Sequence, residues 1–344
     1  MPRPTRFRPL RLLVPIGLLA ALWSVGWWTL AGLAERQFDG WIVREVGEGR
    51  RWTCPDRVVD GFPAALRLHC TRPTFRGEVA GHETDGVVDG LDVAVAVLHP
   101  ASVTVTPRGP LVLRARDEAF LVALNWDALG LAVPFGLDGM PGGGTVAVTR
   151  LAVSGSVPGR GDLNLRIAKL DGHVAATPDV PADRRFAVTL LGVTLPTLDG
   201  LPGLDNGVTE AVGSGVLTAA ASLSTPTVAR LEAWRQAGGL LRLETLRFDT
   251  GSLSGTAGGN LALDDAHRPA GALDLSLVGF EPLARRLGIP VAGARLGGLL
   301  ASVLGGGRPA APAEPGALRL PLTLADGQVQ LGPFPLGIRL SPLY

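Results

Sequence analysis

The sequence predicts a mainly β fold of the α+β class. An N-terminal transmembrane helix is followed by a large, mostly antiparallel, curved β-sheet domain with few helices. Three observations predict it: residues 12–34 carry no charge, apolar and polar residues alternate in short stretches from Gly77 onward, and the ties between those stretches are short. Short ties favour antiparallel neighbours in one sheet. We therefore divide the chain into a cytoplasmic segment 1–11, a membrane anchor 12–34 and a periplasmic β-rich domain 35–344.

The uncharged run is long enough to span a bilayer. Its 23 residues would reach about 34 Å as a helix. Arginines alone precede it, whereas the charges that follow Ala34 nearly cancel. These arginines are Arg3, Arg6, Arg8 and Arg11. The positive-inside bias places the N-terminus in the cytoplasm and the rest outside, as a single-pass inner-membrane protein. Trp27 and Trp28 lie toward the outer end of the run and Trp41 just beyond, where indoles prefer the interface.

A cleaved signal peptide is the main alternative to an anchor. The small residues of Gly32-Leu33-Ala34 offer a cleavage site. The uncharged run exceeds a typical signal core of about 7–15 residues, and tryptophans crowd its second half, so an uncleaved anchor is favoured. Both alternatives deliver the domain to the same compartment. A soluble core helix is a third alternative, which the arginine asymmetry disfavours.

Cys54 and Cys70 are the only cysteines. Val59 and the alternating Leu66 and Leu68 suggest two strands joined by a turn at Asp60-Gly61. The midpoint between the cysteines falls at this turn, so they would lie opposite each other, within disulfide reach. An oxidising compartment would favour the bridge. Metal binding is the competing interpretation, but two cysteines with one adjacent histidine do not make a four-ligand zinc set.

Strand patterns dominate the rest of the chain. Alternation is clear in Leu91–Val97, Ser102–Thr106, Leu163–Ile167 and Leu318–Leu324. Two-residue turns are expected at Asp171-Gly172 and Asp326-Gly327. Several positions opposite the Leu and Val residues are small, such as Ala94 and Ala96 beside Val93 and Val95. Either both sheet faces are covered, or the alanine face lines an apolar groove.

Few helices are expected beyond the anchor. Thr225 can cap a helix that has Pro226 at its first position, Val228, Leu231 and Trp234 on one face, and Gly238-Gly239 at its end. A second apolar stripe, over 294–304, predicts a helix that packs in a core or touches lipid or a partner. Residues 305–316 have the composition of a flexible linker. A seam near 195–207, rich in Gly and Pro, would divide two subdomains.

The sequence lacks recognisable catalytic chemistry. Lys169 is the only lysine, so no phosphate-loop lysine is present. Gly251-Ser252-Leu253-Ser254-Gly255 has the wrong spacing for a nucleophile elbow, and His82-Glu83 lacks a second histidine three residues on. The five histidines are scattered, so metal binding is unsupported. A net charge of +1 with 5% aromatic residues argues against nucleic-acid binding. We expect no enzyme, and no catalytic, cofactor-binding or metal residues.

Several local patterns together resemble a family catalogued as domain of unknown function 2125, from mainly alphaproteobacterial envelopes. The matching residues are Trp52, Cys54, Gly61-Phe62-Pro63, Cys70, Ala233-Trp234-Arg235, Gly238-Gly239, Leu263-Asp264, Arg268-Pro269, Gly271 and Asp326 through Leu336. The resemblance covers most of the chain and implies no catalytic residues. The repeated strand–turn–strand texture is also distantly similar to AsmA-type envelope proteins, whose curved sheets are associated with lipid handling. That similarity concerns fold alone.

Two classes of function remain. The first is a non-enzymatic, membrane-anchored periplasmic protein that binds lipid or another hydrophobic envelope component along an apolar sheet face. The second is a structural or assembly factor whose strand domain docks another envelope protein through a sheet edge or the apolar stripe. The inner membrane, through the N-terminal helix, is a partner in both. A hydrolase is disfavoured because its motifs are absent.

Overall fold

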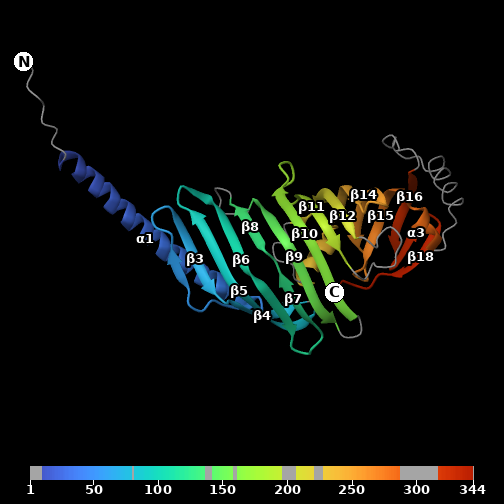
Figure 1. The fold of residues 1–344 in the computed structure, drawn as a ribbon, viewed down its shortest axis with the longest axis horizontal. Coiled ribbons are helices and arrows are strands. Elements are labelled where there is room, and N and C mark those ends of the chain that lie inside the picture. Colours follow the sequence, from blue (N-terminus) through green and yellow to red (C-terminus); the bar gives the residue numbers. More distant parts are fainter. Residues whose placement is uncertain are drawn as a thin grey trace, which may run out of the picture.

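The computed structural model describes residues 10–79, 81–135, 142–157, 161–195, 207–220, 228–286 and 317–343. These residues form three helices and one 18-stranded sheet. The molecule is elongated, with the first helix at one end and the third at the other (Figure 1). The mainly β, antiparallel fold with few helices is therefore confirmed.

The helices are α1 (Leu10–Gly47), α2 (Val228–Gln236) and α3 (Glu281–Arg286). The strands of the first half are β1 (Arg51–Thr53), β2 (Val58–Asp60), β3 (Ala65–Thr71), β4 (Thr74–Val79), β5 (His82–Ala96), β6 (His99–Ala115), β7 (Leu121–Asn125), β8 (Ala128–Pro134) and β9 (Gly143–Val157). Those of the second half are β10 (Gly161–Ala176), β11 (Arg184–Thr194), β12 (Val208–Leu217), β13 (Leu241–Asp249), β14 (Ser254–Leu263), β15 (Pro269–Val278), β16 (Leu318–Ala325), β17 (Gln328–Leu331) and β18 (Phe334–Arg339).

The sheet is a meander. From β9 to β18, each strand pairs antiparallel with the next one along the chain. Strands β3 and β4 lie end to end along β5, and β7 and β8 lie end to end between β6 and β9. Local pairing of this kind needs no long crossover connection, as the short ties in the sequence predict.

Helix α1 extends well beyond the uncharged run. It continues to Gly47, and the first strand, β1, begins at Arg51. No proline interrupts residues 35–46, and Phe38 and Trp41 on this extension pack with each other at 5.6 Å between ring centroids. Gly49, with a positive φ of 79°, follows the helix as a C-terminal stop.

The central strands β9, β10 and β11 share an irregularity: one residue in each strand is unpaired, and the three residues lie opposite one another. Arg150 of β9 and Gly192 of β11 have positive φ values of 50° and 59°. These residues and Ala168 of β10, which lies between them, are left out of the cross-strand pairing, while the register is the same on both sides of them. Thr149 and Arg150 are both exposed, so the alternation changes phase there. Because the alternation changes phase at the unpaired residues, the apolar residues before and after them lie on the same face of the sheet.

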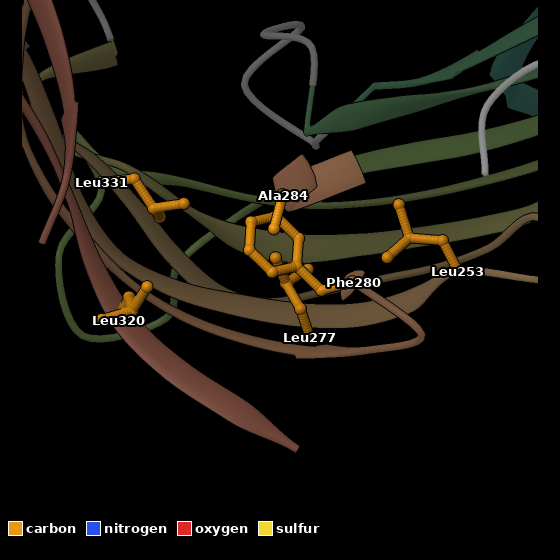
Figure 2. Packing of buried hydrophobic residues seen from close by; sticks show 6 residues of the cluster. All are labelled: Leu253, Leu277, Phe280, Ala284, Leu320 and Leu331. Carbon is orange, nitrogen blue, oxygen red and sulfur yellow. The ribbon is translucent and has the colours of Figure 1, made fainter. Parts of the chain in front are cut away.

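The best-packed core lies in the C-terminal part of the sheet. Its buried members are Leu253, Leu277, Phe280, Ala284, Leu320 and Leu331. Figure 2 shows them on the inner side of the curved strands, with Ala284 of α3 above the sheet. Helix α3 was not predicted, although Glu281-Pro282 is a helix-start signal in the sequence.

The predicted end of α2 and one of the two predicted turns are confirmed, and the other turn is wrong. Helix α2 ends at the predicted glycines, with the Gly239 N–H donating to the Trp234 carbonyl and a positive φ at Gly238. Asp326-Gly327 forms the turn between β16 and β17, as predicted. The turn at Asp171-Gly172 is wrong, because both residues lie inside β10 and pair with both neighbouring strands.

Four expectations fall on residues that the structure does not describe. The helix start at Thr225 and Pro226 is one of them, because residues 221–227 lie outside the described residues. The helix over 294–304 and the linker over 305–316 lie wholly outside the described residues. The seam near 195–207 lies outside them over 196–206. On either side of it, β11 and β12 pair antiparallel within the same sheet. Whether the domain has one or two subdomains stays a prediction.

Candidate functional site: an apolar face beside the anchor

Residues directly paired across antiparallel strands point to the same face of a sheet, and here they form long apolar rows. One row runs through Leu68, Val93, Val105, Leu131, Val146, Gly172, Val188, Gly213, Leu246, Ala257, Leu275 and Leu320. The adjacent row runs through Leu129, Val148, Leu170, Leu190, Ala211, Phe248, Gly255, Leu277 and Leu318. We call the face that carries both rows the apolar face. Neither row contains a polar side chain.

The opposite face carries the polar residues. Ala94 pairs with Arg67 on one side and Thr104 on the other. The expectation that the alanine face lines a groove is therefore wrong: the small residues belong to the polar face, and the Leu and Val residues form the only candidate for a hydrophobic surface among the described strands. Small residues are tolerated there because they leave space for long neighbours such as Arg67 to cover the sheet.

The apolar face differs in burial along its length. In the central strands Val93, Val105, Leu131 and Val188 all keep part of their side chains exposed. In the C-terminal core Leu320 is only 4% exposed. Val148 in the central strand β9 is 6% exposed. A continuous row of apolar side chains that is covered at one end and partly exposed at several central positions is suited to hold a hydrophobic ligand.

The anchor helix packs directly on the start of the sheet. Trp27 is 4% exposed, and its indole N–H donates to the Ala65 carbonyl at 2.9 Å. The Trp23 indole N–H donates to the Pro63 carbonyl at 3.1 Å. Trp27 also meets Phe62 edge-to-face with 5.6 Å between ring centroids. These contacts join the uncharged run to the turn between β2 and β3.

Ion pairs hold the second half of α1. Arg57 donates to Asp39 at 2.6 Å, and this hydrogen bond keeps the pKa of Asp39 below its ordinary value. Arg50 likewise binds Glu45 at 2.6 Å and lowers the pKa of that carboxyl. Near the same end of α1, Arg230 of α2 lies 3.3 Å from Glu48, although 182 residues separate them in the chain. The sheet therefore curls enough to bring α2 beside α1.

Cys54 and Cys70 form a disulfide with a Cα–Cα distance of 5.3 Å. The register behind it differs from the expected one. The hairpin of β2 and β3 pairs Val58 with His69, so Cys54 lies before the paired residues and not opposite Cys70 in a ladder. The bridge instead ties the segment between β1 and β2 to β3, where Cys70 is fully buried.

The histidines are paired with acids at separate places. His69 lies 2.5 Å from Asp92 and 3.3 Å from Asp60, and the hydrogen bond with Asp92, followed by that with Asp60, raises the pKa of His69. His82 lies 2.6 Å from Asp117. Within the described part of the chain, no group of three or more His, Cys, Asp or Glu residues is placed to hold a metal ion.

A hollow with a mixed lining lies over β4 and β5, away from the contacts of Trp23 and Trp27. Its volume is about 590 Å³, and it is lined by the apolar Phe75, Val87 and Val112 as well as by charged residues such as Arg51, Arg114 and Asp85. Asp85 accepts a hydrogen bond from Arg76 at 2.7 Å, and its pKa is lowered by Arg76 and then Arg116. The hollow is confined to β4–β6 and the neighbouring β1, whereas the apolar rows cross the sheet, so the apolar face is the more extended candidate for a hydrophobic ligand.

Residues 27–339 match a bacterial family described as uncharacterized protein conserved in bacteria (DUF2125). The chain belongs to this family. The match begins inside α1, at the buried Trp27, so this contact with the sheet lies within the matched residues, whereas Trp23 precedes them. No curated protein and no solved structure matches the chain, so the likeness to AsmA-type proteins finds no support.

One described helix, α1, is long and apolar enough to cross a membrane. Together with the disulfide, this helix suggests that the DUF2125 domain lies outside the cytoplasm, since disulfides persist in oxidising compartments. The sequence had placed the tryptophans at the membrane interface. It gave no sign that two of them bind the β2–β3 turn, because such contacts depend on the tertiary fold.

Proposed function

We propose that this protein is a non-enzymatic, single-pass inner-membrane protein whose periplasmic sheet binds lipid acyl chains on its apolar face. The observation that carries the proposal is the pair of apolar rows that cross the sheet without a polar side chain and are partly exposed at central residues such as Val105 and Leu131. Water-exposed apolar area of this extent is unfavourable by roughly 25 cal/mol per Å². An acyl chain would remove it from water without demanding directional contacts.

Two features favour an uncleaved anchor over a cleaved signal peptide. Cleavage after Ala34 would cut α1 in its middle and remove Trp27 and Ala31, which are 4% and 5% exposed. It would also expose the carbonyls of Pro63 and Ala65 that the indoles bind. A helix segment that completes the packing of the domain is expected to stay attached to it.

The test is native mass spectrometry of the full chain, purified from its membrane in mild detergent. We expect lipid adducts on the wild-type protein. Val105→Asp places a carboxylate on the apolar face and should abolish the adducts. The matched variant Thr104→Asp places the same charge one residue away, on the polar face, and should retain them. Both variants should fold, because both sites reach water.

Absence of lipid from the wild-type protein, or adducts that survive in Val105→Asp, would contradict the proposal. Stoichiometric capture of another envelope protein by the same face would support the alternative assembly role. Circular dichroism of both variants separates loss of lipid from loss of fold.

A further inference from the structure

The end of the sheet nearest to the anchor is free of charge. The turn Gly61–Leu66, the hairpin Val93–Pro107 and the strand segment Ala128–Phe135 contain no Asp, Glu, Lys or Arg. Strand pairing places these segments side by side, since Ala65 pairs with Ala96, and Val103 pairs with Val133. We call these three segments the apolar rim. The opposite ends of the same strands carry Glu78, Glu83, Arg114 and Arg116.

The apolar rim lies beside the uncharged part of α1. Trp23 stands at the middle of residues 12–34 and bonds the Pro63 carbonyl. Trp27, seven residues before Ala34, bonds the Ala65 carbonyl. At 1.5 Å per residue these contacts lie about 17 Å and 10 Å inside the uncharged run.

The length of α1 determines how deep the apolar rim lies in the membrane. The helix before its first described bond to the sheet, Leu10–Leu22, would reach about 20 Å. A hydrocarbon core is about 30 Å thick, and the arginines before residue 12 are costly to draw into it. If α1 spans the bilayer, Pro63 and Ala65 must therefore lie below the level of the lipid headgroups.

We propose that the apolar rim is inserted into the outer leaflet of the membrane, among the acyl chains, next to α1. This inference rests on the membrane anchor of the proposed function. Phe62 and Leu98 at the rim are 52% and 73% exposed, so lipid would cover apolar side chains that otherwise face water.

The backbone of the rim is suited to this environment, because polar groups in lipid must be satisfied internally. The Gly61 carbonyl accepts from the Ala64 and Ala65 N–H groups, and the Ala64 carbonyl accepts from the Val97 N–H. The two indoles satisfy Pro63 and Ala65. Insertion would also bring the apolar face into direct continuity with the leaflet, so that an acyl chain could reach it without crossing water.

The test measures the membrane depth of three sites in the full chain, reconstituted in phosphatidylcholine–phosphatidylglycerol vesicles. Single variants Leu98→Cys at the rim, Leu121→Cys at the charged end of β7 and Leu18→Cys in α1 are labelled with an environment-sensitive fluorophore. Leu98 and Leu121 are matched leucines that are both exposed. The native cysteines stay bridged and unlabelled.

We expect the Leu98 and Leu18 labels to emit at short wavelength and to be quenched severalfold by lipid-borne nitroxides, while the Leu121 label is quenched by aqueous iodide. A Leu98 label that behaves like Leu121 while Leu18 remains in lipid would overturn the insertion of the rim. Aqueous behaviour at both Leu98 and Leu18 would overturn the anchor as well. Neither result depends on whether the sheet carries lipid, so the readout is separate from the mass-spectrometric test.

Discussion

The central and C-terminal parts of the sheet carry the same apolar rows, but the side chains of these rows are buried to different extents. In the C-terminal part α3 lies over the strands, and Leu277 and Leu320 are 5% and 4% exposed. In the central strands, residues of the same rows such as Val105 and Leu131 are only partly buried. The difference teaches that one pattern of alternation serves two purposes: it builds a core where a helix covers it and a hydrophobic surface where none of the described elements does.

The largest expected effect comes from a matched pair of leucine truncations. Leu320→Ala in the covered core should lower the free energy of unfolding by about 2–5 kcal/mol, because it leaves a cavity. Leu131→Ala in the central strands should cost about 1 kcal/mol, since that side chain is already partly exposed. Thermal unfolding followed by circular dichroism measures both. Equal shifts in melting temperature would remove the distinction between the two regions.

The start of the sheet depends on a covalent bond as well as on packing. Cys54→Ser breaks the bridge that ties the segment before β2 to β3. Loss of this 16-residue loop constraint should cost about 3 kcal/mol, a shift of several degrees in melting temperature. Hydrogen exchange should rise in β1–β4 and stay unchanged in β15–β17. A uniform rise across the sheet would show that the two regions unfold as one unit.

The smallest effect concerns pH and the polar face. The hydrogen bonds to Asp92 and Asp60 raise the pKa of His69 above its ordinary value of 6.5. A raised pKa in the folded state means that His69 stabilises the fold fully below pH 6.5 and that this contribution is lost as pH rises through the raised value. The melting temperature of wild type should exceed that of His69→Gln more at pH 5.5 than at pH 9. An equal or opposite difference would contradict the assigned pairing.

Much of the fold could be predicted from the sequence, for a physical reason. Alternation in Leu91–Val97 and Leu318–Leu324 indicates which side of a strand is shielded from water. Leu318–Leu324 lies within β16, and Leu91–Val97 lies in β5 except for Val97, which follows the strand. Turn chemistry is less decisive. Asp326-Gly327 turns the chain, whereas Asp171-Gly172 continues a strand. Gly172 has a separate role there, because an added Cβ would lie 3.0 Å from the Val146 side chain.

The candidate site was harder to predict. Which face of the sheet is apolar depends on the register between strands: Ala94 belongs with Arg67 and Thr104 only because of pairings distant in the chain. The continuation of α1 and the bonds from Trp23 and Trp27 likewise depend on the folded sheet. The alternation of apolar and polar residues changes phase at Arg150, so a search of the sequence for strict alternation would not place the residues before and after it on the same face.

Photo-crosslinking of the full chain with a phospholipid that bears a reactive group in its acyl chain tests the central claim most directly. The account predicts crosslinks on peptides from β6, β8, β9 and β11, at residues of the apolar rows such as Val105 and Val188. The covered core around Leu320 should stay unlabelled. Crosslinks confined to α1, or placed on the polar face at residues such as Thr104, would contradict a lipid-binding sheet.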